Sequence, residues 1–195
     1  MSSEHDITRR MLLTALASLP LVSVTTASAA VLGKDARRGS STLVAYFSRT
    51  GNTQVIAGLI HRNLSTDLFE IIPENPYPED YLATVEQASQ ERNSGFKPVL
   101  RGKVSGMADY QILYLGFPIW GTSVPPVIRS FLSAYDMNGK TIIPFITHGG
   151  YGPGDSQSVI AQLAPKAEIK DPFVMQTNSE RQMMEKVESW LKVGT

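Results

Sequence analysis

One stretch of the chain, Thr42 to Thr53, joins an apolar run to a turn that is rich in hydroxyl groups. The run Leu43–Phe47 is nearly continuous rather than alternating, which is typical of a central strand buried on both faces. An amphipathic segment with apolar residues at helical spacing begins at Val55. The turn between them therefore follows a strand and precedes a helix, which is where a parallel α/β sheet places a phosphate group.

The turn itself carries groups that suit an anion. Its hydroxyls add donors to those of the backbone, and Gly51 permits backbone angles that a side chain would forbid. Neither the triphosphate fingerprint G-x-x-x-x-G-K-[ST] nor the dinucleotide fingerprint G-x-G-x-x-G is present. The string S-R-T-G-N-T resembles instead the phosphate loop of the flavodoxin family, which binds the 5′-phosphate of FMN. The alternative is an ordinary strand–turn–helix in which Asn52 or Thr53 caps the helix. The resemblance implies cofactor contacts from Ser48, Arg49, Thr50, Gly51, Asn52 and Thr53.

Composition narrows the function classes. The chain has 195 residues, enough for one domain with a substantial core, and its 18 basic residues balance its 18 acidic ones. A chain with this balance lacks the net positive charge that is typical of proteins that bind nucleic acid. The absence of cysteine excludes disulfides, thiol catalysis and iron–sulfur clusters. The three histidines lie far apart in the sequence, so no metal site is expected.

The first 29 residues have the features of a targeting segment. Arg9 and Arg10 precede an apolar stretch, and Ala27-Ser28-Ala29 gives small residues in an A-x-A cleavage pattern. The arginine pair resembles the twin-arginine export signal. A membrane anchor and a general secretory signal are the alternatives, but the apolar run is shorter than the roughly 20 residues of a spanning helix. We therefore expect an export signal (1–29), a linker (30–41), a domain (42–195) and a periplasmic location, with no stable membrane span after cleavage.

The signal and the phosphate loop support one another. A noncovalent flavin is most easily loaded during folding in the cytoplasm, where the flavin is made. A protein that carries it across a membrane needs a pathway that moves folded proteins. Export through the twin-arginine route is therefore the expectation for this chain.

A second apolar run, Ile112–Gly116, leads into a loop that contains Trp120 between proline and glycine residues. A tryptophan at the carboxyl end of a strand can stack on a planar ligand, and an aromatic ring buries about 150–250 Å². The P-x-W segment followed by a glycine and a proline pair resembles the second flavin loop of the family. A quinone is an alternative ligand, and Trp120 packing on its own helix is a third possibility. The resemblance implies cofactor contacts from Pro118, Ile119, Trp120 and Gly121.

A third apolar run, Thr141–Thr147, opens into a segment with four glycines, His148-Gly149-Gly150-Tyr151-Gly152-Pro153-Gly154. Glycines allow the backbone to approach a ligand closely. This segment resembles the third flavin loop, in which backbone amides and one aromatic residue meet the ring edge. Tyr151 is then the candidate to cover the flavin and His148 to hydrogen-bond it, although both are also compatible with ordinary loop positions. The implied contacts are Thr147, His148, Gly149, Gly150 and Tyr151.

Predicted strands near 42–48, 67–72, 111–117, 141–147 and 169–175 alternate with helices. Such alternation indicates a parallel sheet covered on both faces. The resemblance, which spans about 42–191, implies an α/β, flavodoxin-like, doubly wound five-stranded sheet in the order 2-1-3-4-5. The three candidate loops follow strands 1, 3 and 4, which lie at or beside the switch point where such folds bind ligands.

The expected function is electron transfer by bound FMN, with a redox partner protein or a small electron acceptor and no catalytic side chain. An FMN-dependent reductase of NAD(P)H or a quinone is one alternative, and a non-redox binding module on the same scaffold is another. Carrier flavodoxins are strongly acidic, whereas this chain is neutral. That departure weakens the analogy with a mobile carrier and leaves the enzyme class open.

Overall fold

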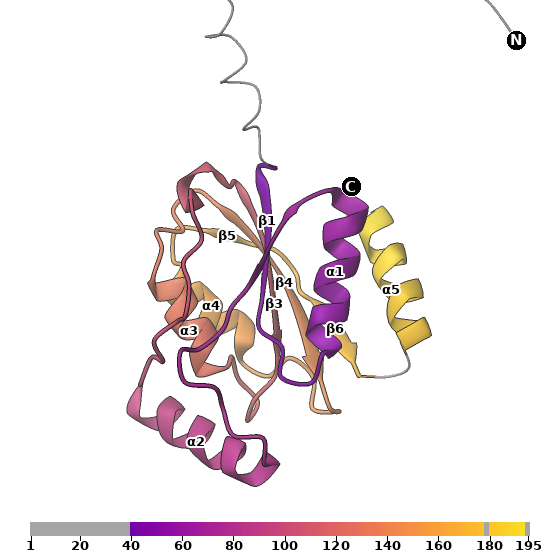
Figure 1. The fold of residues 1–195 in the computed structure, drawn as a ribbon. Helices are drawn as coiled ribbons and strands as arrows, with labels where there is room; N and C mark the ends of the chain where they lie inside the picture. The colour runs from indigo at the N-terminus through magenta and orange to yellow at the C-terminus, as the bar shows by residue number, and fades with distance from the viewer. Residues whose placement is uncertain (1–39, 178–179, 194–195) are drawn as a thin grey trace, which may run out of the picture. The chain divides into compact units, whose positions relative to one another are not determined.

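Strands and helices alternate along the chain in the computed structural model, which describes residues 40–177 and 180–193 (Figure 1). All of these residues belong to a compact unit that spans residues 38–195. The predicted signal peptide, 1–29, and residues 30–39 of the predicted linker lie outside the described residues. The strands are β1 (Thr42–Tyr46), β2 (Asp67–Glu70), β3 (Ile112–Pro118), β4 (Thr141–His148), β5 (Glu168–Ile169) and β6 (Phe173–Gln176). The helices are α1 (Asn52–Leu64), α2 (Tyr81–Ser94), the short 3₁₀ helix η2 (Met107–Asp109), α3 (Pro126–Ser133), α4 (Ser156–Leu163) and α5 (Glu180–Val193).

The strands form one parallel sheet in the order β2-β1-β3-β4-β5, with β6 also paired to β4. This confirms the predicted α/β architecture and its strand order. Tyr46 pairs with Gly116, and Pro118 pairs with Thr147. The carboxyl ends of β1, β3 and β4 therefore meet at one edge of the sheet, and the loops that follow them are neighbours.

The predicted fifth strand is divided into β5 and β6. Ile169 pairs with Ile142 and Phe173 pairs with Phe145, so four steps along the fifth strand face three steps along β4. The extra residue makes a bulge, which interrupts the ladder between the two pieces. Pro144 lies at this point of β4 and has no N–H group to donate, which suits a break in the pairing.

Helices cover both faces of the sheet, with α1 and α5 on one face and α3 and α4 on the other (Figure 1). Along β1, Leu43 and Ala45 are buried on the α3 and α4 face, whereas Val44 and Tyr46 are buried on the α1 and α5 face. Each central strand thus contributes to two cores. This two-sided burial explains why the strand sequences are continuous apolar runs.

Trp190 on α5 packs against the core. Its ring stacks on Phe173 with centroids 4.8 Å apart and planes at 27°, and it meets Tyr114 edge-on at 5.9 Å. Trp190 therefore lies on the sheet face under α5 rather than at the candidate site. None of the described helices is both long and apolar enough to cross a membrane.

The long connection between β2 and β3 carries α2, which contacts α3 (Figure 1, lower left). Tyr81, Val85 and Ala88 stand at helical spacing, which predicts this helix. The three residues do not form a buried face, because Tyr81 is 67% exposed and Val85 is 47% exposed. The helix α2 lies outside the layer of helices that covers the sheet. Only a narrow, partly polar stripe of its own surface is therefore buried. The buried residues of α2 are Thr84, Ala88 and Glu91.

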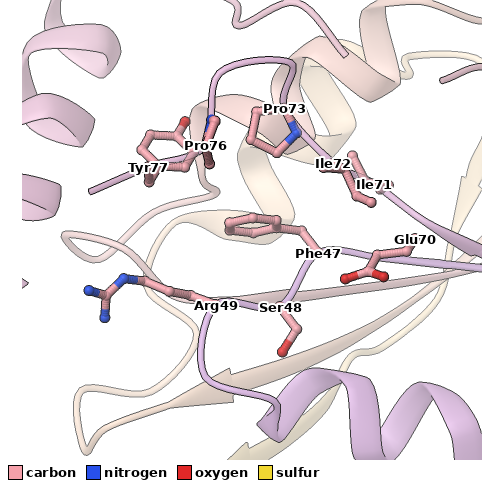
Figure 2. Close-up of a pocket in the computed structure, with 9 residues that line it drawn as sticks. All are labelled: Phe47, Ser48, Arg49, Glu70, Ile71, Ile72, Pro73, Pro76 and Tyr77. Atoms are coloured by element: carbon pink, nitrogen blue, oxygen red, sulfur yellow. The ribbon is translucent and has the colours of Figure 1, made fainter. Parts of the chain in front are cut away.

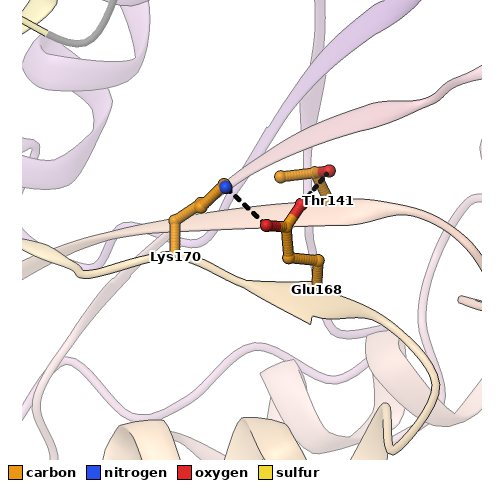
Figure 3. Close-up of polar contacts among 3 residues, drawn as sticks. All are labelled: Thr141, Glu168 and Lys170. Atoms are coloured by element: carbon orange, nitrogen blue, oxygen red, sulfur yellow. Dashed lines mark hydrogen bonds and ion pairs between the residues drawn. The ribbon is translucent and has the colours of Figure 1, made fainter.

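The free edge of the sheet at β5 carries a small polar network (Figure 3). Glu168 accepts hydrogen bonds from the ammonium group of Lys170 and from the hydroxyl of Thr141, the latter at 3.1 Å. The Lys170 ammonium, followed by the Thr141 hydroxyl, lowers the pKa of the Glu168 carboxyl. Charged groups on an exposed edge oppose pairing with the edge of another chain.

Candidate functional site

The loop after β1 leaves the first turn of α1 without a side-chain cap. The N-cap position is Gly51, whose φ is 88°, so the alternative in which Asn52 or Thr53 caps the helix is wrong. Within the described chain, no oxygen accepts a hydrogen bond from the N–H groups of residues 52–54. The helix therefore directs free donors and the positive end of its dipole toward the carboxyl edge of the sheet.

The turn is shaped by its own side chains. The hydroxyl of Ser48 accepts from the N–H of Gly51 at 3.1 Å, and the hydroxyl of Thr50 accepts from the side-chain amide of Asn52 at 3.2 Å. A Cβ at Gly51 would meet no atom within 4 Å, so its positive φ, and not lack of space, favours glycine here. The turn is thus pre-formed around an uncapped helix end.

Thr53 and Thr147 join the first and third candidate loops. Their hydroxyl oxygens lie 2.9 Å apart, although the residues are 94 positions apart in the sequence. Both residues are buried, at 1% and 2% exposure. One hydroxyl donates to the other, so one hydroxyl hydrogen of the pair remains available for a further acceptor.

Arg49 is directed away from the turn. Its guanidinium group donates to the main-chain carbonyl of Glu79 at 2.6 Å and to that of Pro78 at 3.5 Å. Figure 2 shows this side chain extending away from Phe47 and Ser48. Arg49 therefore holds the segment before α2 against the predicted phosphate loop, and its charge stays beside that loop rather than inside it.

The loop after β3 contains a tight hairpin. Trp120 and Ser123 exchange main-chain hydrogen bonds at 3.1 and 3.2 Å. The two residues between them, Gly121 and Thr122, have φ of 56° and 65°, which matches the two positive φ angles of a type I′ turn. Ile119 donates to the carbonyl of Thr147 at 2.8 Å, so this loop continues the pairing of β3 with β4 beyond Pro118.

The ring of Trp120 belongs to a cluster of three aromatic side chains. It meets Phe47 edge-on at 5.3 Å and Tyr77 edge-on at 4.7 Å between ring centroids. Phe47 and Tyr77 also touch each other at 6.1 Å. The ring is only half-buried, so this cluster supports Trp120 from one side and leaves part of it accessible.

The second and third loops touch at Thr122. Its carbonyl accepts from the N–H of Asp155 at 3.0 Å. A Cβ at Gly154 would lie 1.8 Å from the same carbonyl oxygen, so only glycine fits at this contact. Four glycines in this segment predict that its backbone approaches a ligand closely. Gly154 instead permits one loop to approach another, and nothing in the sequence reveals that partner.

The glycine loop folds back on His148. The main-chain N–H groups of Gly150 and Gly152 both donate to Nδ1 of the imidazole, at 3.0 and 3.1 Å. Tyr151 projects from this loop and is 87% exposed. A Cβ at Gly149 would meet nothing within 4 Å. The loop is therefore open to solvent on its outer side and is held from within by one side chain.

Behind the aromatic cluster lies a hydrogen-bonded pair that the sequence does not indicate, the half-buried Tyr77 and the buried Glu91. The hydroxyl of Tyr77 donates to the carboxylate of Glu91 at 2.7 Å, and Gln87 donates to the same carboxylate at 2.8 Å. Burial, followed by the neighbouring Glu91 carboxylate, raises the pKa of Tyr77. The two residues lie in a turn and a helix with no recognisable spacing, so no sequence signal indicates the pair.

A shallow hollow of about 200 Å³ lies beside the phosphate loop, at the carboxyl ends of β1 and β2 (Figure 2). Its wall is mostly apolar and includes Phe47 and Tyr77, the two rings that contact Trp120. Among the described residues, no group of three or more His, Asp or Glu side chains gathers to hold a metal ion. The lining residues are Phe47, Ser48, Arg49, Glu70, Ile71, Ile72, Pro73, Pro76 and Tyr77.

The structure thus brings all three predicted loops to one edge of the sheet and joins them to one another. The family model described as Flavodoxin matches residues 41–192. A protein of Bacteroides uniformis ATCC 8492, described as a flavoprotein, is 31% identical over 80% of this chain and 99% of its own, with a TM-score of 0.70. A protein of Bacteroides eggerthii DSM 20697, also described as a flavoprotein, is 30% identical over 78% of this chain and 96% of its own, with a TM-score of 0.67.

A flavoprotein of Lactobacillus acidophilus NCFM, solved in complex with FMN, shares the fold at 21% identity. That match covers 74% of this chain and 97% of the other, with a TM-score of 0.59. A comparison with curated proteins finds no match. The family model covers nearly all of the described residues, so this chain belongs to the flavodoxin family.

Proposed function

We propose that this protein binds FMN at the carboxyl edge of its sheet and transfers electrons. One observation carries the proposal: the uncapped start of α1 and the glycine loop after β4 are locked together by the Thr53–Thr147 hydrogen bond. An anion receptor is thereby fixed next to the loop expected to meet a ring system. Membership of the family and the FMN complex of the Lactobacillus acidophilus fold neighbour support this choice of ligand.

Each loop then has a distinct part in binding. The free N–H groups at the start of α1, with the turn hydroxyls, hold the phosphate. Trp120, supported by its aromatic neighbours, offers an apolar surface to the flavin ring. The phosphate contacts come from Ser48, Thr50, Gly51, Asn52 and Thr53, with Arg49 beside them. The ring contacts come from Pro118, Ile119, Trp120, Gly121, Thr147, His148, Gly149, Gly150 and Tyr151.

FMN supplies reversible electron transfer when it is bound, and the protein orients it and limits its contact with water. No side chain at the three loops is required as an acid or base for such a transfer. The donor and acceptor are a redox partner protein or a small electron acceptor. The exposed Tyr151 and the open glycine loop keep one side of the site accessible to either.

The hollow lined by Phe47 and Tyr77 favours a second candidate function, reduction of a small apolar acceptor such as a quinone. This recess is mostly apolar, and the rings of Phe47 and Tyr77 that line it also contact Trp120. The holoprotein should then oxidise NAD(P)H in the presence of a quinone. Absence of NAD(P)H oxidation at saturating nucleotide removes this candidate and leaves the electron carrier.

The export of the folded, flavin-loaded protein to the periplasm is the second part of the proposal. It rests on the arginine pair and on the A-x-A pattern before residue 30. The cytoplasm is where flavin is made, so a route for folded proteins is the one that delivers a loaded protein.

The deciding experiment is a titration of the purified apoprotein with FMN and with riboflavin, followed by visible absorption and flavin fluorescence. We expect one equivalent of FMN to bind with quenched fluorescence, and riboflavin to bind more weakly because it lacks the phosphate. If neither flavin binds at high concentration, the chain is a non-redox binding module on this scaffold. If both bind equally, the start of α1 is not the phosphate site.

A further inference from the structure

The imidazole of His148 accepts two hydrogen bonds at a single nitrogen. Gly150 and Gly152 donate their main-chain N–H groups to Nδ1 at 3.0 and 3.1 Å. An N–H group donates only to a nitrogen that has a lone pair, so Nδ1 carries no proton. The network therefore requires the neutral ring with its proton on Nε2.

These two hydrogen bonds restrain the glycine loop through its main-chain N–H groups. In the described chain, no other acceptor is found for the main-chain N–H groups of residues 149–154. Gly150, Gly152 and Gly154 all have positive φ, between 56° and 138°, and glycine has more conformations to lose than any other residue. A loop of this composition needs a restraint to keep one conformation. His148 provides it by accepting hydrogen bonds from two amides of the loop.

The base of this restraint is rigid. His148 is the last residue of β4 and pairs with Gln176 on β6. Its carbonyl accepts from the N–H of Thr177 at 3.0 Å. The adjacent Thr147 is 2% exposed and bonded to Thr53. The imidazole thus ties the glycine loop to the fixed carboxyl end of β4.

We infer that His148 is a positioning residue: as the Nε2–H tautomer it holds the glycine loop in the shape that receives the flavin ring. The inference rests on the proposed function for its ligand, but the hydrogen bonds themselves are present without one. Because Nδ1 is occupied by the chain's own amides, a hydrogen bond from His148 to the flavin has to come from Nε2. Nε2 remains as the ring's free donor.

The first test measures the tautomer in the apoprotein by long-range ¹H–¹⁵N correlation of the histidine rings. We expect His148 to show a non-protonated Nδ1 and a protonated Nε2. His61 is a control in the same spectrum, because its Nδ1 faces the carbonyl of Thr66 at 2.5 Å and must carry the proton. A protonated Nδ1, or a rapid average of both tautomers, at His148 overturns the inference.

The second test uses a pair of substitutions that differ in where the acceptor lies. In His148→Asn the side-chain oxygen occupies about the place of Nδ1, whereas in His148→Gln it reaches about the place of Nε2. We expect the Gln variant to bind FMN roughly tenfold more weakly than the Asn variant, because only the Asn oxygen can accept the two amide hydrogen bonds. Amide exchange of Gly150 and Gly152 should accelerate in the Gln variant and not in the Asn variant.

The outcomes separate the inference from the proposed function. Equal FMN affinity of the wild-type and Gln proteins, or equal loss in the Asn and Gln proteins, overturns the positioning role while FMN binding stands. A wild-type protein that binds no FMN overturns the proposed function, and with it the role toward the flavin. In that case the tautomer and the amide exchange of the apoprotein still show whether His148 restrains the loop. If the Gln variant fails to fold, the Asn variant and the tautomer spectrum decide the matter.

Discussion

The hydroxyl groups of Thr53 and Thr147 share one hydrogen bond of 2.9 Å in the buried base of the candidate site. Thr53 lies in the first turn of α1, and Thr147 is the penultimate residue of β4. The bond therefore joins the element that would hold a phosphate to the loop that would hold a ring. Both threonines are almost fully buried. The hydrogen bond therefore fixes the position of the two loops and offers little surface of its own to a ligand.

The first prediction is that this pair is energetically coupled. Thr53→Val and Thr147→Val each leave one buried hydroxyl without its partner, which costs about 1–3 kcal/mol of unfolding free energy. The double variant should cost less than the sum of the two, since no unpaired hydroxyl remains. Urea unfolding of the wild-type apoprotein, the two single variants and the double variant measures the four free energies of this double-mutant cycle. Strict additivity would mean that the two hydroxyls do not interact.

Much of the fold could be predicted because burial on both faces marks a strand clearly. Leu43–Phe47 and Ile112–Gly116 have no polar positions for a helix face, and each is followed by a turn. The division of the fifth strand could not be predicted. It depends on an extra residue relative to β4 and on Pro144 in the partner strand, so it becomes visible only when the two strands are paired.

The loops of the site could be located from the sequence, but their contacts with one another could not. Glycine indicates freedom of the backbone without indicating what it approaches, and Gly154 approaches Thr122 rather than a ligand. The exposure of α2 could not be predicted for a related reason. Helical spacing identifies a face, but Tyr81 is covered only if another element lies against it, and no described element does.

The second prediction concerns the contact between the second and third loops. Gly154→Ala places a Cβ 1.8 Å from the carbonyl oxygen of Thr122 at a residue whose φ is 56°. We expect a loss of about 1–3 kcal/mol of unfolding free energy, together with weaker FMN binding, because the loops must separate. Gly149→Ala is the matched control for the unfolding free energy of the apoprotein, since its Cβ would meet no protein atom within 4 Å. Equal losses of unfolding free energy in the two variants would show that the contact is unimportant.

The third prediction follows from the hydrogen-bonded Tyr77–Glu91 pair. Burial and the Glu91 carboxylate raise the pKa of Tyr77 above its ordinary value of 10.0. Above pH 10 the unfolded chain therefore loses a proton that the folded protein keeps, so the unfolding free energy falls as the pH rises. In Tyr77→Phe the unfolding free energy should fall less steeply with pH. The change in slope corresponds to at most one proton per molecule. Denaturant unfolding between pH 8 and about pH 11 measures the slope.

A control distinguishes this effect from the general loss of a tyrosine hydroxyl. Tyr151 is 87% exposed, so Tyr151→Phe removes a hydroxyl from the surface without touching the hydrogen-bonded pair. The slope of the Tyr151→Phe protein should match that of the wild type. Parallel slopes for the wild-type and Tyr77→Phe proteins would contradict the prediction.

The fourth prediction tests export. Replacing Arg9 and Arg10 with lysine keeps the positive charge of the segment but removes the arginine pair that the twin-arginine route requires. We expect the variant to remain in the cytoplasm as folded protein, whereas the wild type is recovered from the periplasm. Fractionation of cells that produce each form measures this. Recovery of both forms from the periplasm would point to a general secretory signal.

The fifth prediction isolates the phosphate from the rest of the flavin. Thr50 is exposed, and its hydroxyl holds the amide of Asn52 within the turn. Thr50→Val removes one donor to a charged oxygen, a hydrogen bond worth about 1.5–3 kcal/mol, so FMN should bind at least tenfold more weakly. Riboflavin has no phosphate, and its Kd should change little. Thr66→Val is the control, because the Thr66 hydroxyl is buried without a partner among the described residues and lies at the far end of α1. Equal weakening of FMN and riboflavin would assign Thr50 to the ring or the sugar rather than to the phosphate.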